Sequence, residues 1–252
     1  VVTAKANDQG QLVLSQQQFF IGDGQDTGRT WQIPLNSNYP AAPQIMVDQE
    51  VVLGDYQDLR EAAGEPFRLN VGNNSHFIVK YDDQLLQDIL DHADQLAAIS
   101  QRQLLQDLRL LAAGQQISYA ALLPLLARFA NSQSAIVNAE LYHIANSLKM
   151  FVTPGSAEEK QLKRFFNLLS QGQVARLGWL PKDGESNDDQ LTRPYVLNAA
   201  LYAHNEEAIK AAHQIFIDNQ DQLVSLSADV RGLILKNEVQ NFGSHELFDQ
   251  LL

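Results

Sequence analysis

Residues 77–93 read FIVKYDDQLLQDILDHA, and the spacing of apolar residues changes within this stretch. Up to Tyr81, every second side chain is apolar or aromatic, which is typical of a β-strand with one buried face. From Leu85 onward, apolar residues recur every three or four positions, which is typical of an amphipathic α-helix. Asp82 or Asp83 can cap this helix, because a carboxylate accepts hydrogen bonds from free amides of the first turn. We therefore expect a β part to end and a helical part to begin here.

The residues before this boundary form short alternating stretches separated by turns. Glycine tolerates positive φ, so Asp8-Gln9-Gly10 is expected to turn the chain within a hairpin over residues 1–19. The alternation predicts further strands at residues 31–35, a pair at 45–53, one at 67–71 and one at 77–81. Several short strands with turns between them indicate a small antiparallel β-sandwich.

Helical spacing continues through the rest of the chain. Ser100 and Ser118 are expected to cap two helices. Gly114 is expected to end one in the left-handed conformation, and Pro124 to kink another. Ser156-Ala157-Glu158-Glu159 has the spacing of a capping box. About eight or nine short helices joined by short turns indicate an α-solenoid of stacked helix pairs.

These patterns predict an α+β multidomain fold. A β-sandwich domain is expected over residues 1–82 and an α-solenoid domain over residues 83–252. The chain ends on four apolar residues, and no polar helix follows to cap the stack: Leu247, Phe248, Leu251 and Leu252. This ending fits either a solenoid truncated at its C-terminal end or a frayed terminus.

Composition excludes several classes of protein. The 252 residues are 45% hydrophobic and 19% charged, which is a globular and not a disordered composition. The net charge of −12 is spread along the chain without a basic stripe, so we expect no nucleic-acid partner. No apolar run approaches the roughly 20 residues that span a bilayer, so no membrane partner is expected. The absence of cysteine excludes disulfides and suits the cytoplasm.

The sequence offers little catalytic chemistry. A zinc-peptidase helix needs two histidines one turn apart with a glutamate beside the first, and none of the six histidines has such a partner. His245-Glu246 with Asp249 comes nearest, and chance explains it. The glycine-rich residues 22–28 lack the lysine and helix of a phosphate loop. We therefore assign no catalytic, cofactor-binding or metal-binding residue to this chain.

Arg193 is a weak candidate for substrate binding. It lies directly before Pro194 and follows an acidic loop. Its planar guanidinium could bind a carboxylate of a ligand. The simpler interpretation, which we favour, is that it pairs with Glu185, Asp188 or Asp189 of the preceding loop.

Several segments together resemble the C-terminal half of the aminopeptidase N family of zinc metallopeptidases. The segments that carry the resemblance are Val1-Val2-Thr3, residues 14–20, residues 30–35 (TWQIPL), Leu69-Asn70, residues 77–82, the Arg102, Leu105 and Asp107 set, and residues 185–194. Each motif is weak alone, but their order covers nearly the whole chain. Gln101 departs from the family, which usually has an aspartate there, and so does His76-Phe77-Ile78, where Gly-Phe-Tyr-Arg is common.

The resemblance implies a non-catalytic C-terminal portion of an aminopeptidase. In that family the zinc helix and the substrate-amine loop, Gly-x-Met-x-Asn, come earlier in the chain, and neither occurs here. The implied partners are that upstream catalytic zinc domain and a peptide substrate, with zinc held only by the parent enzyme. The helical part would help to enclose the active site and contact the peptide.

The family's helical domain is longer than the helical part here, which favours truncation over a frayed end. Self-association through an exposed C-terminal end is then expected. Two other classes stay open: a free-standing solenoid scaffold that binds a protein or peptide in its groove, and an independent hydrolase that uses clustered carboxylates.

Overall fold

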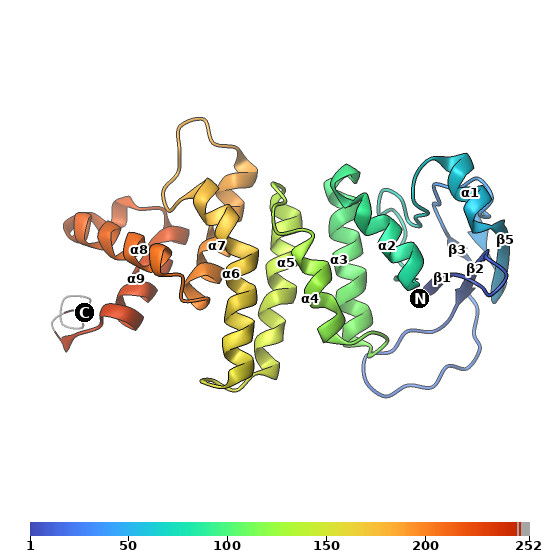
Figure 1. The fold of residues 1–252 in the computed structure, drawn as a ribbon, viewed down its shortest axis with the longest axis horizontal. Helices are drawn as coiled ribbons and strands as arrows, with labels where there is room; N and C mark the ends of the chain where they lie inside the picture. The colour runs from blue at the N-terminus through green and yellow to red at the C-terminus, as the bar shows by residue number, and fades with distance from the viewer. Residues whose placement is uncertain (246, 248–252) are drawn as a thin grey trace. The chain divides into compact units, whose positions relative to one another are not determined.

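The computed structural model describes residues 1–245 and residue 247. It divides into two compact units, Val1–Arg128 and Phe129–Leu252, and each is described by itself. A small sheet comes first and helices follow, so the predicted α+β fold class is confirmed (Figure 1). Among the described residues, no helix combines the length and the apolar character needed to cross a bilayer.

The change from strands to helices occurs where the sequence predicts it. The last strand ends at Tyr81 and the next helix begins at Asp83. The first helices after the sheet nevertheless lie in the same compact unit as the sheet, because that unit extends to Arg128. The division into domains of residues 1–82 and 83–252 stays a prediction.

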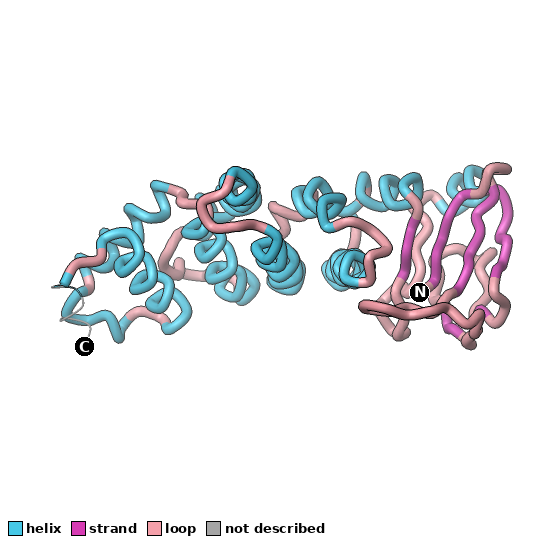
Figure 2. The backbone as a smooth tube through the Cα atoms, turned by 90° about the horizontal axis from the view of Figure 1, so that it is seen from below, coloured by secondary structure: helices cyan, strands magenta, loops and turns pink. Residues whose placement is uncertain are grey.

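The sheet of the first unit has the strand order β5-β2-β1-β6, and Figure 2 shows its strands side by side in magenta. Its strands are β1 (Val2–Ala6), β2 (Gln11–Gln16), β5 (Glu50–Asp55) and β6 (Val79–Tyr81). β2 pairs antiparallel with β1 and with β5, whereas β1 pairs parallel with β6. The sheet is therefore mixed, with antiparallel pairing in two of its three ladders.

A second, two-stranded sheet completes the β part. It pairs β3 (Ile33–Pro34) with β4 (Ile45–Met46) in antiparallel register. Side chains of both sheets enter one buried apolar cluster, which includes Val2, Leu14 and Met46. Shared burial between two sheets is what the predicted sandwich requires.

The strand predicted at residues 67–71 does not form, and this prediction is wrong. Asn70 has a φ of 53°, a left-handed conformation that an extended strand cannot contain. Its amide donates to the Leu35 carbonyl, and the Leu69 amide donates to the Tyr81 hydroxyl at 3.0 Å. Phe67 and Leu69 are buried nonetheless, so the alternation reports burial and not a strand.

Helix α1 (Tyr56–Ala63) lies within the β part, where the alternation predicts no helix. Its limits follow from local chemistry. The Asp55 side chain accepts a hydrogen bond from the Asp58 amide, and Gly64 adopts a φ of 71° at the other end. A carboxylate cap and a left-handed glycine are the usual start and stop signals of a helix.

The helices of the first unit after the sheet are α2 (Asp83–Asp91), the 3-10 turn η1 (Ala93–Gln95), α3 (Ala98–Ala113) and α4 (Tyr119–Ala127). Of the two possible caps of α2, the structure selects Asp82. One of its oxygens accepts from the Leu85 amide at 2.8 Å. The other accepts from the Ala6 amide of β1 at 2.6 Å, so this carboxylate joins the sheet to the helix.

One predicted helix start is corrected and another is confirmed. α3 begins at Ala98, with Ala97 at the cap position, and not at Ser100. Ser118 does cap α4, because its hydroxyl accepts from the Ala121 amide. Pro124 lies inside α4, and the kink expected there stays a prediction.

Gly114 ends α3, but for a different reason from the one expected. Its φ is −83°, and the left-handed residue is Gln115 with a φ of 58°. A Cβ atom on Gly114 would lie 2.5 Å from the Phe19 ring and 2.9 Å from the Phe20 carbonyl oxygen. Glycine is therefore required because the loop after β2 passes close to the end of α3.

The described residues of the second unit form helices joined by loops. Its helices are α5 (Ala135–Ser147), η2 (Leu148–Phe151), α6 (Ala157–Leu177), α7 (Asn187–Tyr202), α8 (Glu206–Asp218), η3 (Gln220–Ser225) and α9 (Ala228–Phe242). α7 packs against α5, α6, α8 and α9, so it is central to this unit. At the start of α6, Ser156 accepts from the Glu159 amide and the Glu159 carboxylate accepts from the Gly155 amide, which confirms the predicted capping box.

The expected exposure of the C-terminal apolar residues does not hold for Leu247. This side chain is 9% exposed and packs with Trp179, Phe216 and Ile234. Packing against these side chains removes Leu247 from water, which stabilises the folded unit. Phe248, Leu251 and Leu252 lie outside the described residues.

Substitution of Asp82 tests the joint between sheet and helix. Asp82→Ala removes the cap of α2 and the acceptor of the Ala6 amide, so we expect a loss of about 1–3 kcal/mol in the free energy of unfolding. Asp83→Ala is the matched control, because this neighbouring carboxylate is exposed and contributes only a few tenths of a kcal/mol through the helix dipole. Urea unfolding followed by circular dichroism measures both. Equal losses in the two variants would contradict the assigned role.

Candidate functional site

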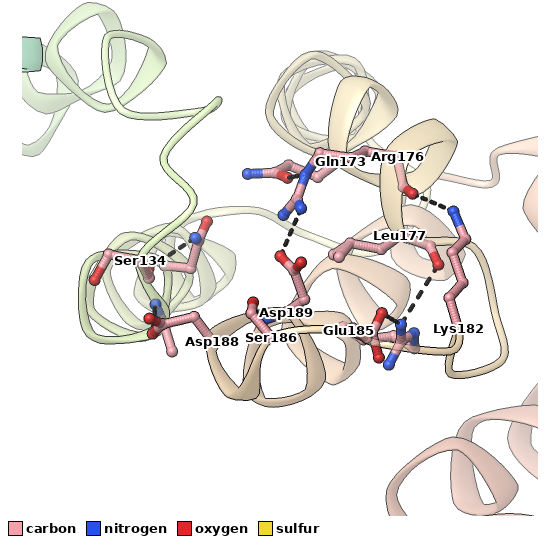
Figure 3. Close-up of polar contacts among 12 residues, drawn as sticks. Ser134, Gln173, Arg176, Leu177, Lys182, Glu185, Ser186, Asp188 and Asp189 are labelled. Atoms are coloured by element: carbon pink, nitrogen blue, oxygen red, sulfur yellow. Dashed lines mark hydrogen bonds and ion pairs between the residues drawn. The ribbon is translucent and has the colours of Figure 1, made fainter.

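Arg193 lies on α7, and its side chain is 2% exposed. Its guanidinium pairs with Glu185, whose side chain is 4% exposed. It also donates to the Leu177 carbonyl at 3.5 Å (Figure 3) and to the Gly178 carbonyl at 3.2 Å. Of the three carboxylates that the sequence left open as partners, the structure brings Glu185 to Arg193.

The other two acids of the loop have separate partners. Asp189 accepts from Arg176 Nη1 at 2.5 Å, and Asp188 accepts from the Ala135 amide at 2.8 Å (Figure 3). Burial raises the pKa of Asp189. The hydrogen bonds from Arg176 and Ser186 outweigh this effect and hold the pKa below its ordinary value. These contacts tie the loop to the end of α6 and the start of α5. The acidic loop therefore has a structural role, and Arg193 is satisfied within the protein.

A cluster of cations and aromatic rings lies elsewhere in the second unit. Lys149 Nζ is 3.9 Å from the centroid of the Tyr202 ring and 4.8 Å from that of Phe166. Burial, and then the neighbouring Lys236, lower the pKa of Lys149 to about 8, whereas the aromatic faces favour its charged form. Lys163, 5.6 Å from the Tyr202 ring, pairs with a glutamate. The cluster holds positive charge in a chain that is acidic overall.

The first unit contains a groove of about 980 Å³. It is lined by residues from separate parts of the chain: Val1, 17–19, 31–34, 73–78 and the α3 residues Arg102, Gln103, Gln106, Asp107 and Leu110. The lining is mixed, with amide side chains, one arginine and several aromatic rings. Trp31 is 38% exposed here. Such a mixture is typical of surfaces that receive another polypeptide segment.

Asp107 supplies the carboxyl group among the lining residues of this groove. It is 6% exposed, and its Oδ2 accepts from the Val79 amide of β6 at 3.2 Å. Burial raises the pKa of Asp107 to about 7, although hydrogen bonds from Val79 and Gln103 act in the opposite direction. The carboxyl group therefore changes its charge near neutral pH at the junction of sheet and α3.

Metal-ligand side chains do not converge in the described part of the chain. Within it, no group of three His, Asp, Glu or Cys residues could hold an ion. His213 contacts a single carboxylate, Glu238, at 2.9 Å and stacks on Phe242. The weak pattern at His245 involves Glu246 and Asp249, which lie outside the described residues.

Comparison with known proteins decides the family. Residues 67–252 match the family described as ERAP1-like C-terminal domain. This chain belongs to that family. Together with the relatives described below, this match confirms the resemblance to the aminopeptidase N family. The matching family model describes a C-terminal domain.

The relatives of the whole chain are aminopeptidases. Aminopeptidase N of Lactobacillus helveticus is 58% identical over the whole chain, which covers 30% of that protein. Aminopeptidase N of Lactococcus lactis subsp. lactis (strain IL1403) is 38% identical over 98% of the chain and 29% of its own length. Aminopeptidase M1 of Arabidopsis thaliana is 28% identical over 92% of the chain and 28% of its length. The chain thus spans about 30% of the length of its curated relatives.

The groove was not predicted from the amino-acid sequence. Its lining comes from segments that are far apart in the chain, and no motif links them. One signal was available. Asp107 interrupts an otherwise apolar helix face between Leu104 and Leu111, and a carboxylate on a buried face needs a partner.

Substitution of Arg193 distinguishes a structural pair from a ligand site. Arg193→Met leaves the buried Glu185 carboxylate without its partner, so we expect a loss of about 3–5 kcal/mol in the free energy of unfolding. The double variant Arg193→Met with Glu185→Leu should recover most of this loss, because no buried charge is left unpaired. Urea unfolding measures both.

Lys210→Met is the control for this experiment. It breaks the Lys210–Glu206 pair, whose side chains are 75% and 84% exposed. Exposed pairs contribute about 0–1 kcal/mol. A loss at Arg193 no larger than the loss at Lys210 would show that the pair has no structural role.

Asp107 should make stability depend on pH. Because its folded pKa of about 7 exceeds the ordinary 3.8, the folded state holds the proton more tightly. This contribution is fully present below about pH 4 and is lost as the pH rises towards 7, with a slope of up to about 1.4 kcal/mol per pH unit. Asp107→Asn should remove that slope. Urea unfolding between pH 4 and 8 measures it, and identical pH profiles of the two proteins would refute the prediction.

Proposed function

We propose that this chain is the non-catalytic C-terminal portion of a zinc aminopeptidase that removes N-terminal residues from peptides. One observation carries the proposal: 58% identity to an aminopeptidase N over the whole chain, with 30% of that relative covered. Identity at this level over an entire length supports a shared role within a longer protein. The proposed partners are the catalytic zinc domain upstream and the peptide substrate.

Zinc in the proposed parent would be held outside this chain. A catalytic zinc site needs three protein ligands and an open position for water or substrate. The described residues do not fit this requirement, since no three potential ligands converge among them. Zinc supplies an activated water in such enzymes. No step of peptide cleavage is therefore assigned to residues of this chain.

The proposed task of the helical part is to help enclose the active site and to contact the peptide. Two observations support this proposal: the resemblance to the aminopeptidase N family, and the helices and exposed apolar side chains of the second unit. Stacked helices offer broad surfaces for extended ligands. The second unit also has exposed apolar side chains, such as Met150 at 73%, near the Lys149 cation cluster. The cysteine-free composition supports a reducing cytoplasm as its location.

Activity and metal content test the proposal together. The full-length product of the gene should release the chromophore from an aminoacyl chromogenic substrate and hold about one zinc per chain. The 252-residue chain alone should do neither, because it lacks the ligands and the catalytic glutamate. Elemental analysis after purification without chelators gives the zinc content. Cleavage or stoichiometric zinc in the isolated chain would refute the assignment, and an inactive full-length product would favour a solenoid scaffold.

A further inference from the structure

The groove of the first unit lies where the central strand of the sheet would continue. β1 runs between β2 and β6. Val1, the residue directly before β1, lines the groove. The residues after β2, 17–19, line the groove too, and so do residues 76–78 before β6. The groove is therefore flanked by the continuations of both neighbours of β1.

The ladder between β1 and β2 is still intact at Val1. The Val1 nitrogen donates to the Gln17 carbonyl at 2.8 Å, and the Gln17 amide donates to the Val1 carbonyl at 3.0 Å. This is a hydrogen-bonded pair of an antiparallel ladder. In the same register, a residue before Val1 would lie opposite Gln18, and the one before that opposite Phe19.

The parallel ladder leads to the same place. Val2 pairs with Val79, so a residue before Val1 would lie beside Phe77 and the next one beside His76. Phe19, Phe77 and His76 all line the groove. The antiparallel and the parallel register therefore place the residues before Val1 in the same groove. There they would have backbone partners on both sides.

We propose that the groove is the docking site of the polypeptide that immediately precedes Val1 in the longer protein. This segment extends β1 between residues 17–19 and residues 76–78. It is also the connection between the catalytic part and the sheet. This inference rests on the proposed function, which places a catalytic part upstream. The relatives supply the length that this requires, because the chain covers only 30% of the Lactobacillus helveticus enzyme.

The chemistry of the groove suits a polypeptide segment. A strand added between two others needs backbone partners on both sides and pockets for alternate side chains. The aromatic rings of Trp31 and Phe77 can cover apolar side chains, while Arg102, Gln106 and Asn74 can bind backbone carbonyl groups. The groove has the size of several side chains and not of one small ion.

A cross-strand disulfide tests the proposal in the full-length protein. Opposite Gln18 the ladder forms a non-hydrogen-bonded pair, in which Cα atoms are about 4.5 Å apart, within the range of a disulfide. Gln18→Cys is combined with cysteine at the residue before Val1, and this chain adds no other cysteine. We expect a disulfide between the two positions, detected by mass spectrometry of unreduced peptides.

The matched control moves one cysteine to Gln9, in the turn at the far end of the β1–β2 hairpin. Five strand residues at about 3.3 Å each separate the two ends, so no disulfide is expected. A disulfide with Gln9, or none with Gln18, would overturn the proposal. A disulfide between two copies of the protein would assign the groove to a second copy instead.

Two further measurements keep the outcomes separable. Amide hydrogen exchange is measured on the unsubstituted full-length protein, so the result does not depend on a variant that folds. We expect slowed exchange at the amide of the second residue before Val1, because that amide faces the Phe19 carbonyl. Ordinary, fast exchange there would overturn the docking proposal. Aminopeptidase activity of the same sample tests the proposed function by itself: an active enzyme without the disulfide or the slowed exchange refutes only the docking.

Discussion

The Asp82 carboxylate is the contact on which the first unit depends. One oxygen binds the Ala6 amide at the end of β1, and the other binds the Leu85 amide in the first turn of α2. The Asp82 amide itself donates to the Ala4 carbonyl. A single residue thus fixes the direction in which the chain leaves the sheet. Its neighbour Tyr81 ends the last strand, and the Tyr81 hydroxyl accepts a hydrogen bond from the Leu69 amide, so the junction also holds the loop that contains Leu69.

The change of period at this junction could be predicted because each period reflects a geometry of burial. Alternate residues of β1 are buried, Val79 of β6 is buried, and Leu85 and Ile89, four positions apart, are buried along α2. The strand prediction failed at residues 67–71 for the same reason, since Phe67 and Leu69 are buried in a loop. Alternating burial does not reveal the left-handed backbone of Asn70, which depends on contacts with distant residues.

The candidate site was predictable only in part. The Arg193 pairing was among the sequence alternatives because Glu185 is close in the chain and a buried guanidinium requires an anion. The choice among three acids required the fold, which directs Asp188 to α5 and Asp189 to Arg176. The groove could not be predicted, because its lining residues, such as Trp31, Asn74 and Asp107, are far apart in the chain and come together only in the folded unit.

Parallel pairing of β1 with β6 has a consequence for how this protein folds. The hairpin of β1 and β2 closes over a short turn, whereas Val2 and Val79 are separated by 77 positions in the chain. Contacts between distant residues cost more loop entropy before they contribute energy, and they slow folding. During synthesis on the ribosome, the hairpin can form early, while one side of β1 stays unpaired until residues 79–81 emerge. An unpaired strand edge of this kind invites association with other chains. The nascent protein therefore exposes an edge that favours aggregation in the interval between synthesis of β2 and synthesis of β6.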